Sequence, residues 1–89
     1  MKTYVDDLLA RLRVEMPDCD SNLLRLYALL ALIQGSYTAL ADVHDAWSLW
    51  AVGIDRDHPA IVPFNELTPE VQELDRPYME AIRRIAEHV

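Results

Sequence analysis

Hydrophobic residues recur every three or four positions along most of this chain, which is the spacing of amphipathic helices. In the first run, from Tyr4 to Met16, the apolar positions are Val5, Leu8, Leu9, Leu12 and Met16. Thr3 stands where an N-cap is expected, and Pro17 ends the run because proline cannot continue a helix. This pattern predicts a first helix over residues 4–16 with one buried face.

The second run is apolar on nearly every side. From Asn22 to Gln34 the one charged residue is Arg25, and Gly35 follows as the expected C-terminal stop. A helix without a polar face belongs in the middle of a bundle, because most of its circumference has to be covered. The run is too short to span a membrane, so we interpret it as the core helix, with the alternative that a second subunit covers one face.

A third helix is predicted from Ala39 to about Ala51, with Thr38 as its N-cap and Gly53 near its end. Its apolar stripe consists of Val43, Ala46, Trp47 and Trp50. This helix holds both tryptophans of the chain, so it is expected to contribute much of the apolar surface that the fold buries.

The helical pattern stops between Gly53 and Thr68, where Pro59 and Pro63 restrict the backbone. Flexible linkers are polar, whereas this stretch carries several apolar residues, namely Ile61, Val62, Phe64 and Leu67. We therefore expect an ordered loop that packs across the core helix.

Two helix starts follow one another near the C-terminus. Thr68-Pro69-Glu70 has the form of an N-cap, a first-turn proline and a first-turn carboxylate, and it predicts a short helix through Leu74. Because Pro77 inside an unbroken helix would cost ~3 kcal/mol, we expect either a kink or a new helix capped by Asp75. The last helix is predicted from Pro77 to about His88, with a face made of Tyr78, Ile82, Ile85 and Val89.

The whole pattern predicts an all-α fold, a small bundle of four to five helices with an ordered, proline-containing crossing loop. At 89 residues the chain is expected to form one domain over residues 1–89. A core of this size is thin, so association with a partner or with a second copy would add stability.

The net charge of the chain limits the classes of partner that it can bind. Fifteen Asp and Glu against eight Lys and Arg give a net charge of −7, and no stripe of basic residues could neutralise successive phosphates. Polymeric nucleic acid is therefore not an expected partner. A small anionic ligand stays open, because one or two arginines with a helix N-terminus can hold a phosphate.

Cysteine usage and hydropathy indicate a cytoplasmic protein. Cys19 is the only cysteine, so neither a disulfide framework nor a cysteine metal site is predicted. No apolar run approaches the ~18 residues that a membrane span needs, and nothing at the N-terminus directs export. We expect a protein of the cytoplasm without a membrane partner.

One stretch of the chain resembles a known family. The segments His44-Asp45-Ala46-Trp47, His58-Pro59-Ala60-Ile61-Val62-Pro63-Phe64-Asn65-Glu66-Leu67 and Asp75-Arg76 are similar to the RyR domain, first described in ryanodine receptors and also found in prokaryotes and their viruses. The chain also resembles small proteins of actinobacteria and actinobacteriophages. The resemblance covers roughly the C-terminal half, and the segment from Ser48 to Asp57 is shorter than in the RyR family.

The resemblance implies a non-enzymatic helical module that senses or sequesters a small ligand, with nucleotide-derived molecules first among the candidates. In a viral setting the protein would act in the host cytoplasm. The resemblance together with the aromatic and basic residues nearby predicts a pocket, whose candidate members are Tyr37, His44, Trp47, Trp50, His58, Arg76 and Tyr78.

Four of these residues also have a structural interpretation. Trp47 could be core, and His44 could bond a carbonyl group beside it instead of facing a ligand. His58 could hold a phosphate or satisfy loop backbone. Arg76 could join a helix start around an anion, or pair with Asp75, Glu73 or Glu80.

No catalytic constellation is recognised. The three histidines lack the spacing of metal ligands, the paired aspartates stand at helix starts, and neither the serines nor Cys19 has an identifiable base. We therefore expect no enzyme activity, no metal and no cofactor. Two functions remain open: a module that binds a small nucleotide-type ligand, and a protein-interaction adaptor that docks on a partner protein or forms a homo-oligomer.

Overall fold

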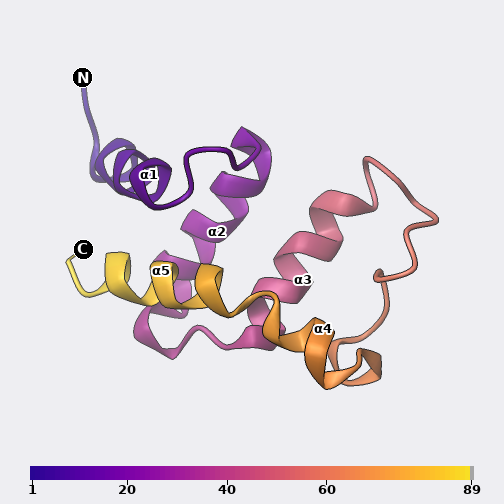
Figure 1. The fold of residues 1–89 in the computed structure, drawn as a ribbon. Coiled ribbons are helices and arrows are strands. Elements are labelled where there is room, and N and C mark those ends of the chain that lie inside the picture. Colours follow the sequence, from indigo (N-terminus) through magenta and orange to yellow (C-terminus); the bar gives the residue numbers. More distant parts are fainter. Residues whose placement is uncertain (89) are drawn as a thin grey trace.

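Five α-helices and no strand make up residues 1–88, the part of the chain that the computed structural model describes (Figure 1). The helices are α1 (Tyr4–Glu15), α2 (Ser21–Ile33), α3 (Leu40–Ala51), α4 (Pro69–Glu73) and α5 (Arg76–Ala86). Two single 3-10 turns, Gly35–Tyr37 and Phe64–Glu66, precede α3 and α4. The prediction of a small all-α bundle is confirmed.

Local capping chemistry fixes most of the helix ends. At α1 the Thr3 hydroxyl accepts a hydrogen bond from the Asp6 N–H, while the Asp6 carboxylate accepts one from the Thr3 N–H at 2.7 Å. At α4 the Thr68 hydroxyl accepts from the Val71 N–H, with Pro69 in the first turn. Gly35 follows α2 with φ +58°, a left-handed conformation that glycine adopts without steric cost.

The start of α3 differs from the prediction that Thr38 is its N-cap. Ala39 holds that position, and its N–H donates to the Asp42 carboxylate at 2.8 Å. Thr38 is fully buried, and its hydroxyl donates to the Gly35 carbonyl instead. The carboxylate of Asp42, the third residue of α3, therefore accepts the hydrogen bond that caps this helix, in place of the predicted Thr38 hydroxyl.

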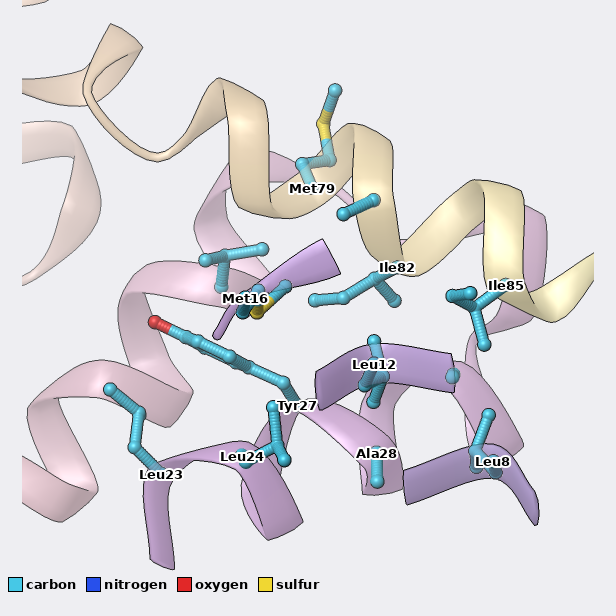
Figure 2. Close-up of a cluster of buried hydrophobic side chains, with 13 residues drawn as sticks. Leu8, Leu12, Met16, Leu23, Leu24, Tyr27, Ala28, Met79, Ile82 and Ile85 are labelled. Atoms are coloured by element: carbon cyan, nitrogen blue, oxygen red, sulfur yellow. The ribbon is translucent and has the colours of Figure 1, made fainter. Parts of the chain in front are cut away.

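The hydrophobic core lies where α1, α2 and α5 meet, with α3 closing one side (Figure 2). Leu12 and Ile82 are completely buried, and α2 packs against α1, α3 and α5. The buried face of α5 consists of Met79, Ala81, Ile82 and Ile85. Tyr78, which was predicted to lie on that face, is 41% exposed because it stands one position aside of it, and Val89 lies outside the described residues.

One side of α2 is left open. Leu29, Leu32 and Ile33 are 49%, 40% and 66% exposed, so α2 is the central helix without being covered on every side. The apolar character of this helix is therefore explained by three packed faces, while its fourth face meets solvent.

The segment between α3 and α4 is the proline-containing loop. It runs beside α3, at the end of the molecule away from both chain termini (Figure 1). Its side chains and carbonyl groups contact α3, through Phe64 and the Val62 carbonyl, instead of lying across α2 as expected. Within residues 1–88 no helix combines the length and the apolar character that a membrane crossing requires.

Candidate functional site

The seven residues predicted to share a pocket lie in four different places. Trp47, Trp50 and Tyr78 line one cleft. His44 and His58 lie behind that cleft, Arg76 lies beside a second hollow, and Tyr37 lies on an outer surface.

His44 is part of the packed interior. Its side chain is 2% exposed, and Nε2 lies 2.7 Å from the Val62 carbonyl oxygen. Because a carbonyl can only accept, Nε2 carries a proton and donates it, which fixes the tautomer of the neutral ring. His44 also stacks on Trp47 with ring centroids 5.8 Å apart and meets Phe64 on another side. This imidazole therefore anchors the loop to α3.

His58 also serves the loop. Its Nδ1 accepts a hydrogen bond from the Ala60 N–H at 3.1 Å, so the proton of the neutral ring sits on Nε2. The ring meets Trp47 edge-on, with centroids 5.0 Å apart. Trp47 is thus held between two imidazoles, which leaves the rest of the indole for the cleft.

Arg76 and Tyr37 are remote from the tryptophans' cleft. The Arg76 guanidinium pairs with Glu73 through two hydrogen bonds of 2.5 and 3.0 Å, the salt bridge that the sequence offered as an alternative to anion binding. Arg76 lines a second hollow of about 370 Å³ together with Arg83, whose Nε donates to the Thr38 carbonyl. Tyr37 is 85% exposed beyond α2.

A cleft of about 900 Å³ lies at one end of the bundle. Its walls come from the end of α1, the turn at residues 17–20, the start of α2, one side of α3 and the start of α5. We call it the acidic cleft, because carboxylates outnumber basic groups along it. Its volume falls in the range of ligand-binding pockets.

Aromatic rings form much of its wall. Tyr27 and Tyr78 contact each other with centroids 5.9 Å apart, and Trp47 and Trp50 of α3 line the same cleft. Aromatic walls supply a large apolar area at low entropic cost, and their faces attract cations. The cleft is therefore suited to organic groups.

Carboxylates outnumber cations along the cleft. Its acidic members are Glu15, Asp18, Asp20 and Asp75. Arg84 is its one basic member, and its guanidinium already pairs with Glu15 at 3.0 Å. The cleft thus presents several negative charges beside aromatic rings, which repels anions and attracts cations.

Two polar side chains fix the shape of this cleft. The Asp20 carboxylate caps α2 by accepting from the Asn22 N–H at 2.8 Å, and the same oxygen accepts from Trp50 Nε1 at 3.1 Å. The Arg13 guanidinium donates to the carbonyls of Met16 and Cys19 in the turn that borders the cleft. The acidic border is therefore held by side chains and is not a free loop.

Asp75 and Tyr27 both line the cleft, and neither side chain makes a hydrogen bond among residues 1–88. Asp75 occupies the N-cap position of α5, yet its side chain makes no capping hydrogen bond. Tyr27 is 2% exposed, and its hydroxyl makes no hydrogen bond among residues 1–88. Every fully buried polar side-chain atom of these residues has a hydrogen-bond partner. The hydroxyl oxygen must therefore reach the open cleft, and both groups remain available to a ligand.

The cleft offers recognition but little chemistry. Cys19 lies on its border, where burial raises the pKa of the thiol despite nearby Arg13, and a protonated thiol is a poor nucleophile. Among the described residues no group of three His, Cys, Asp or Glu side chains is gathered as a metal site would require.

Sequence reasoning missed Asp18, Asp20, Tyr27 and Asp75 as members of one site. Asp18, Asp20 and Asp75 were assigned to turns and caps, and Tyr27 to the core helix. The one available signal was Tyr27, a polar-tipped ring in a run of aliphatic residues, because a buried tyrosine hydroxyl usually needs a partner.

Comparison with known proteins places the chain in a family. Residues 3–87 match the model of a domain of unknown function, DUF7701, and the chain belongs to that family. No curated protein and no solved structure matches the chain. No RyR domain is found, so the resemblance to that family is wrong. The residues that suggested it are explained by packing, since His44 bonds the loop at Val62 and Phe64 packs on His44.

Proposed function

We propose that this family member is a non-enzymatic interaction module, whose acidic cleft receives a basic, amphipathic segment of a partner protein. The observation that supports this best is the combination in one cleft of four aromatic rings with four carboxylates and a single, already paired arginine. Docking of a protein partner is the adaptor function predicted from the sequence as an alternative.

Charge complementarity points to a basic partner. A lysine or arginine side chain entering the cleft meets Asp18, Asp20 and Asp75 within one cavity, where charges interact more strongly than in bulk water. The net charge of −7 adds long-range attraction for such a partner and disfavours a second copy of this acidic chain.

The aromatic walls point to an apolar side on the same segment. Trp47, Trp50 and Tyr78 come from two helices and surround one cavity, the arrangement in which buried anchors contribute most of the binding energy. An amphipathic helix presents apolar anchors and basic groups within one or two turns, so it matches both features.

A nucleotide-type ligand, the first of the two expected functions, stays an untested prediction. Its basis in the RyR resemblance has been removed, and phosphate groups in the cleft would face carboxylates without a free cation. Cytoplasmic location and the absence of enzyme activity likewise remain predictions that accompany this proposal.

A pair of synthetic peptides tests the proposal. A fluorescein-labelled amphipathic helix of leucine and lysine, about 14 residues long and so about 21 Å, is compared with its leucine and glutamate counterpart. We expect the basic peptide to bind with a Kd below about 100 μM, and more weakly as salt is raised, while the acidic peptide does not bind.

Matched variants locate the binding. Tyr78→Ala in the cleft should weaken the basic peptide at least about fivefold, whereas Tyr37→Ala on the outer surface should change its Kd less than about twofold. Asp18→Asn and Asp57→Asn form a second matched pair. Both remove one negative charge, the first in the cleft and the second outside it. Equal affinity for all four variants, or no binding of the basic peptide, would contradict the proposal.

A further inference from the structure

We infer that Tyr27 and Asp75 form the floor of a subsite in the acidic cleft for the cationic end of one lysine or arginine side chain. This inference rests on the proposed function and makes it more specific, because it assigns one position in the cleft to one kind of side chain.

The first observation concerns Asp75. An aspartate at an N-cap normally accepts from the N–H groups of its own helix, as Asp20 does for α2. The side chain of Asp75 makes no such bond to α5, and it lines the cleft. Its half-buried position raises the pKa of the carboxyl, while nearby His44 acts in the opposite direction. This carboxylate lacks the donors that would offset its loss of water.

The second observation concerns Tyr27. Its ring belongs to the same core cluster as Leu23 and Met16, and its hydroxyl oxygen points away from Leu8 and Leu12 (Figure 2). Burial raises the pKa of this phenol, and the negative charge of Asp75 raises it further. The hydroxyl therefore stays neutral, and Tyr27 and Asp75 line the same cleft.

The surroundings select a cation that carries an alkyl stem. Trp47, Trp50 and Tyr78 line the same cleft, and aromatic faces stabilise an ammonium or guanidinium group near their centres. The stem of lysine or arginine packs on such rings while its charged end reaches deeper. A neutral side chain of equal length would leave Asp75 without a donor.

Small probes separate the charge from the shape. N-acetyl-arginine amide and N-acetyl-lysine amide carry the cation, and N-acetyl-norleucine amide has a similar stem without charge. Binding is followed by NMR through the carboxyl carbon of Asp75 and the two indole N–H signals. We expect both cationic probes to shift these signals and to lower the pKa of Asp75, and norleucine amide to bind at least about fivefold more weakly.

Two substitutions test the floor itself. Asp75→Asn should weaken the cationic probes about tenfold or more, and Asp57→Asn, which makes the same charge change on an exposed loop, should leave them within about twofold. Tyr27→Phe keeps the ring and removes the hydroxyl, so it should weaken the cations about threefold and leave norleucine amide unchanged.

The outcomes separate this inference from the proposed function. If the basic peptide binds but Asp75→Asn leaves both the peptide and the cationic probes unaffected, the subsite is wrong and the proposed function stands. If the cationic probes bind at Asp75 while the peptide does not bind, the subsite stands and the proposed partner is wrong. No signal change at about 100 mM cationic probe overturns the subsite.

Discussion

A single carboxylate oxygen of Asp20 joins two helices, because Oδ1 accepts both from the N-terminal backbone of α2 and from the indole Nε1 of Trp50 at the end of α3. The two contacts bring the turn after α1 and the tryptophans of α3 to the same cavity. Asp20 is therefore one of the side chains that fix the shape of the acidic cleft.

Removing that carboxylate should lower stability and loosen the cleft. Asp20→Ala loses a helix cap and a side-chain hydrogen bond, so we expect the free energy of unfolding to fall by about 1–3 kcal/mol in urea titrations. Trp50→Phe keeps the helix cap and removes only the hydrogen bond from the indole. The loss of this hydrogen bond should lower the free energy of unfolding by about 1 kcal/mol, in addition to the effect of the smaller ring. An Asp20→Ala protein as stable as the parent would show that the contact contributes nothing.

Arg13 should matter to the cleft without touching its interior. Its guanidinium donates to carbonyls of the turn at residues 16–19 and to the Ser21 hydroxyl. We expect Arg13→Ala to increase hydrogen exchange in that turn and to weaken binding of the basic peptide. Loss of the positive charge alone would act in the opposite direction and strengthen this binding. Arg25→Ala, an exposed arginine of α2, is the charge-matched control, and an equal effect of both variants would contradict the role of Arg13.

His44 should hold the loop between α3 and α4. In His44→Phe the Val62 carbonyl loses its 2.7 Å donor, so we expect a loss of about 1–3 kcal/mol in unfolding free energy. Proteolytic cleavage within residues 53–68 should become faster. His58 makes its hydrogen bond to Ala60 inside the same loop, so His58→Phe serves as a comparison that keeps the hydrogen bond between His44 and the Val62 carbonyl. Unchanged cleavage in His44→Phe would rule out the anchor.

Asp75 should stabilise the fold least when it is ionised. Burial raises the pKa of this carboxyl in the folded protein above its ordinary value of 3.8, and His44 partly opposes this. The folded state thus holds the proton more tightly, and stability from this group is fully present below the ordinary pKa and lost as pH rises through the raised one. Asp75→Asn should therefore gain stability over the parent as pH rises from about 3 to 7. A constant difference across this range would show that Asp75 is not desolvated.

The local elements could be predicted from the sequence because short-range chemistry decides them. Thr3 and Thr68 accept from the first turns of their helices, and Gly35 takes the left-handed backbone that ends α2. Thr38 failed as a cap because Asp42, three residues inside α3, bonds the Ala39 N–H instead. Thr38 is a plausible cap in sequence, and only packing shows that it is buried.

The cleft could not be predicted, because its members come together only through the angles at which helices pack. Asp20 and Asp75 are far apart in the chain and line the same cavity. Arg76, one residue after Asp75, points to a different hollow and pairs with Glu73. Periodicity predicted that the helix carrying Tyr27 is the core helix, but it gave no sign that the hydroxyl of this residue reaches the cavity.

The indole signals test the central claim most directly, since the two tryptophans of the chain both line the acidic cleft. A proton–nitrogen correlation spectrum is recorded while the leucine and lysine peptide is added, and again with its glutamate counterpart and with an adenine nucleotide. The account predicts that both indole N–H signals move with the basic peptide and stay in place with the two anions. Indole signals that ignore the basic peptide, or that follow the nucleotide, would contradict it.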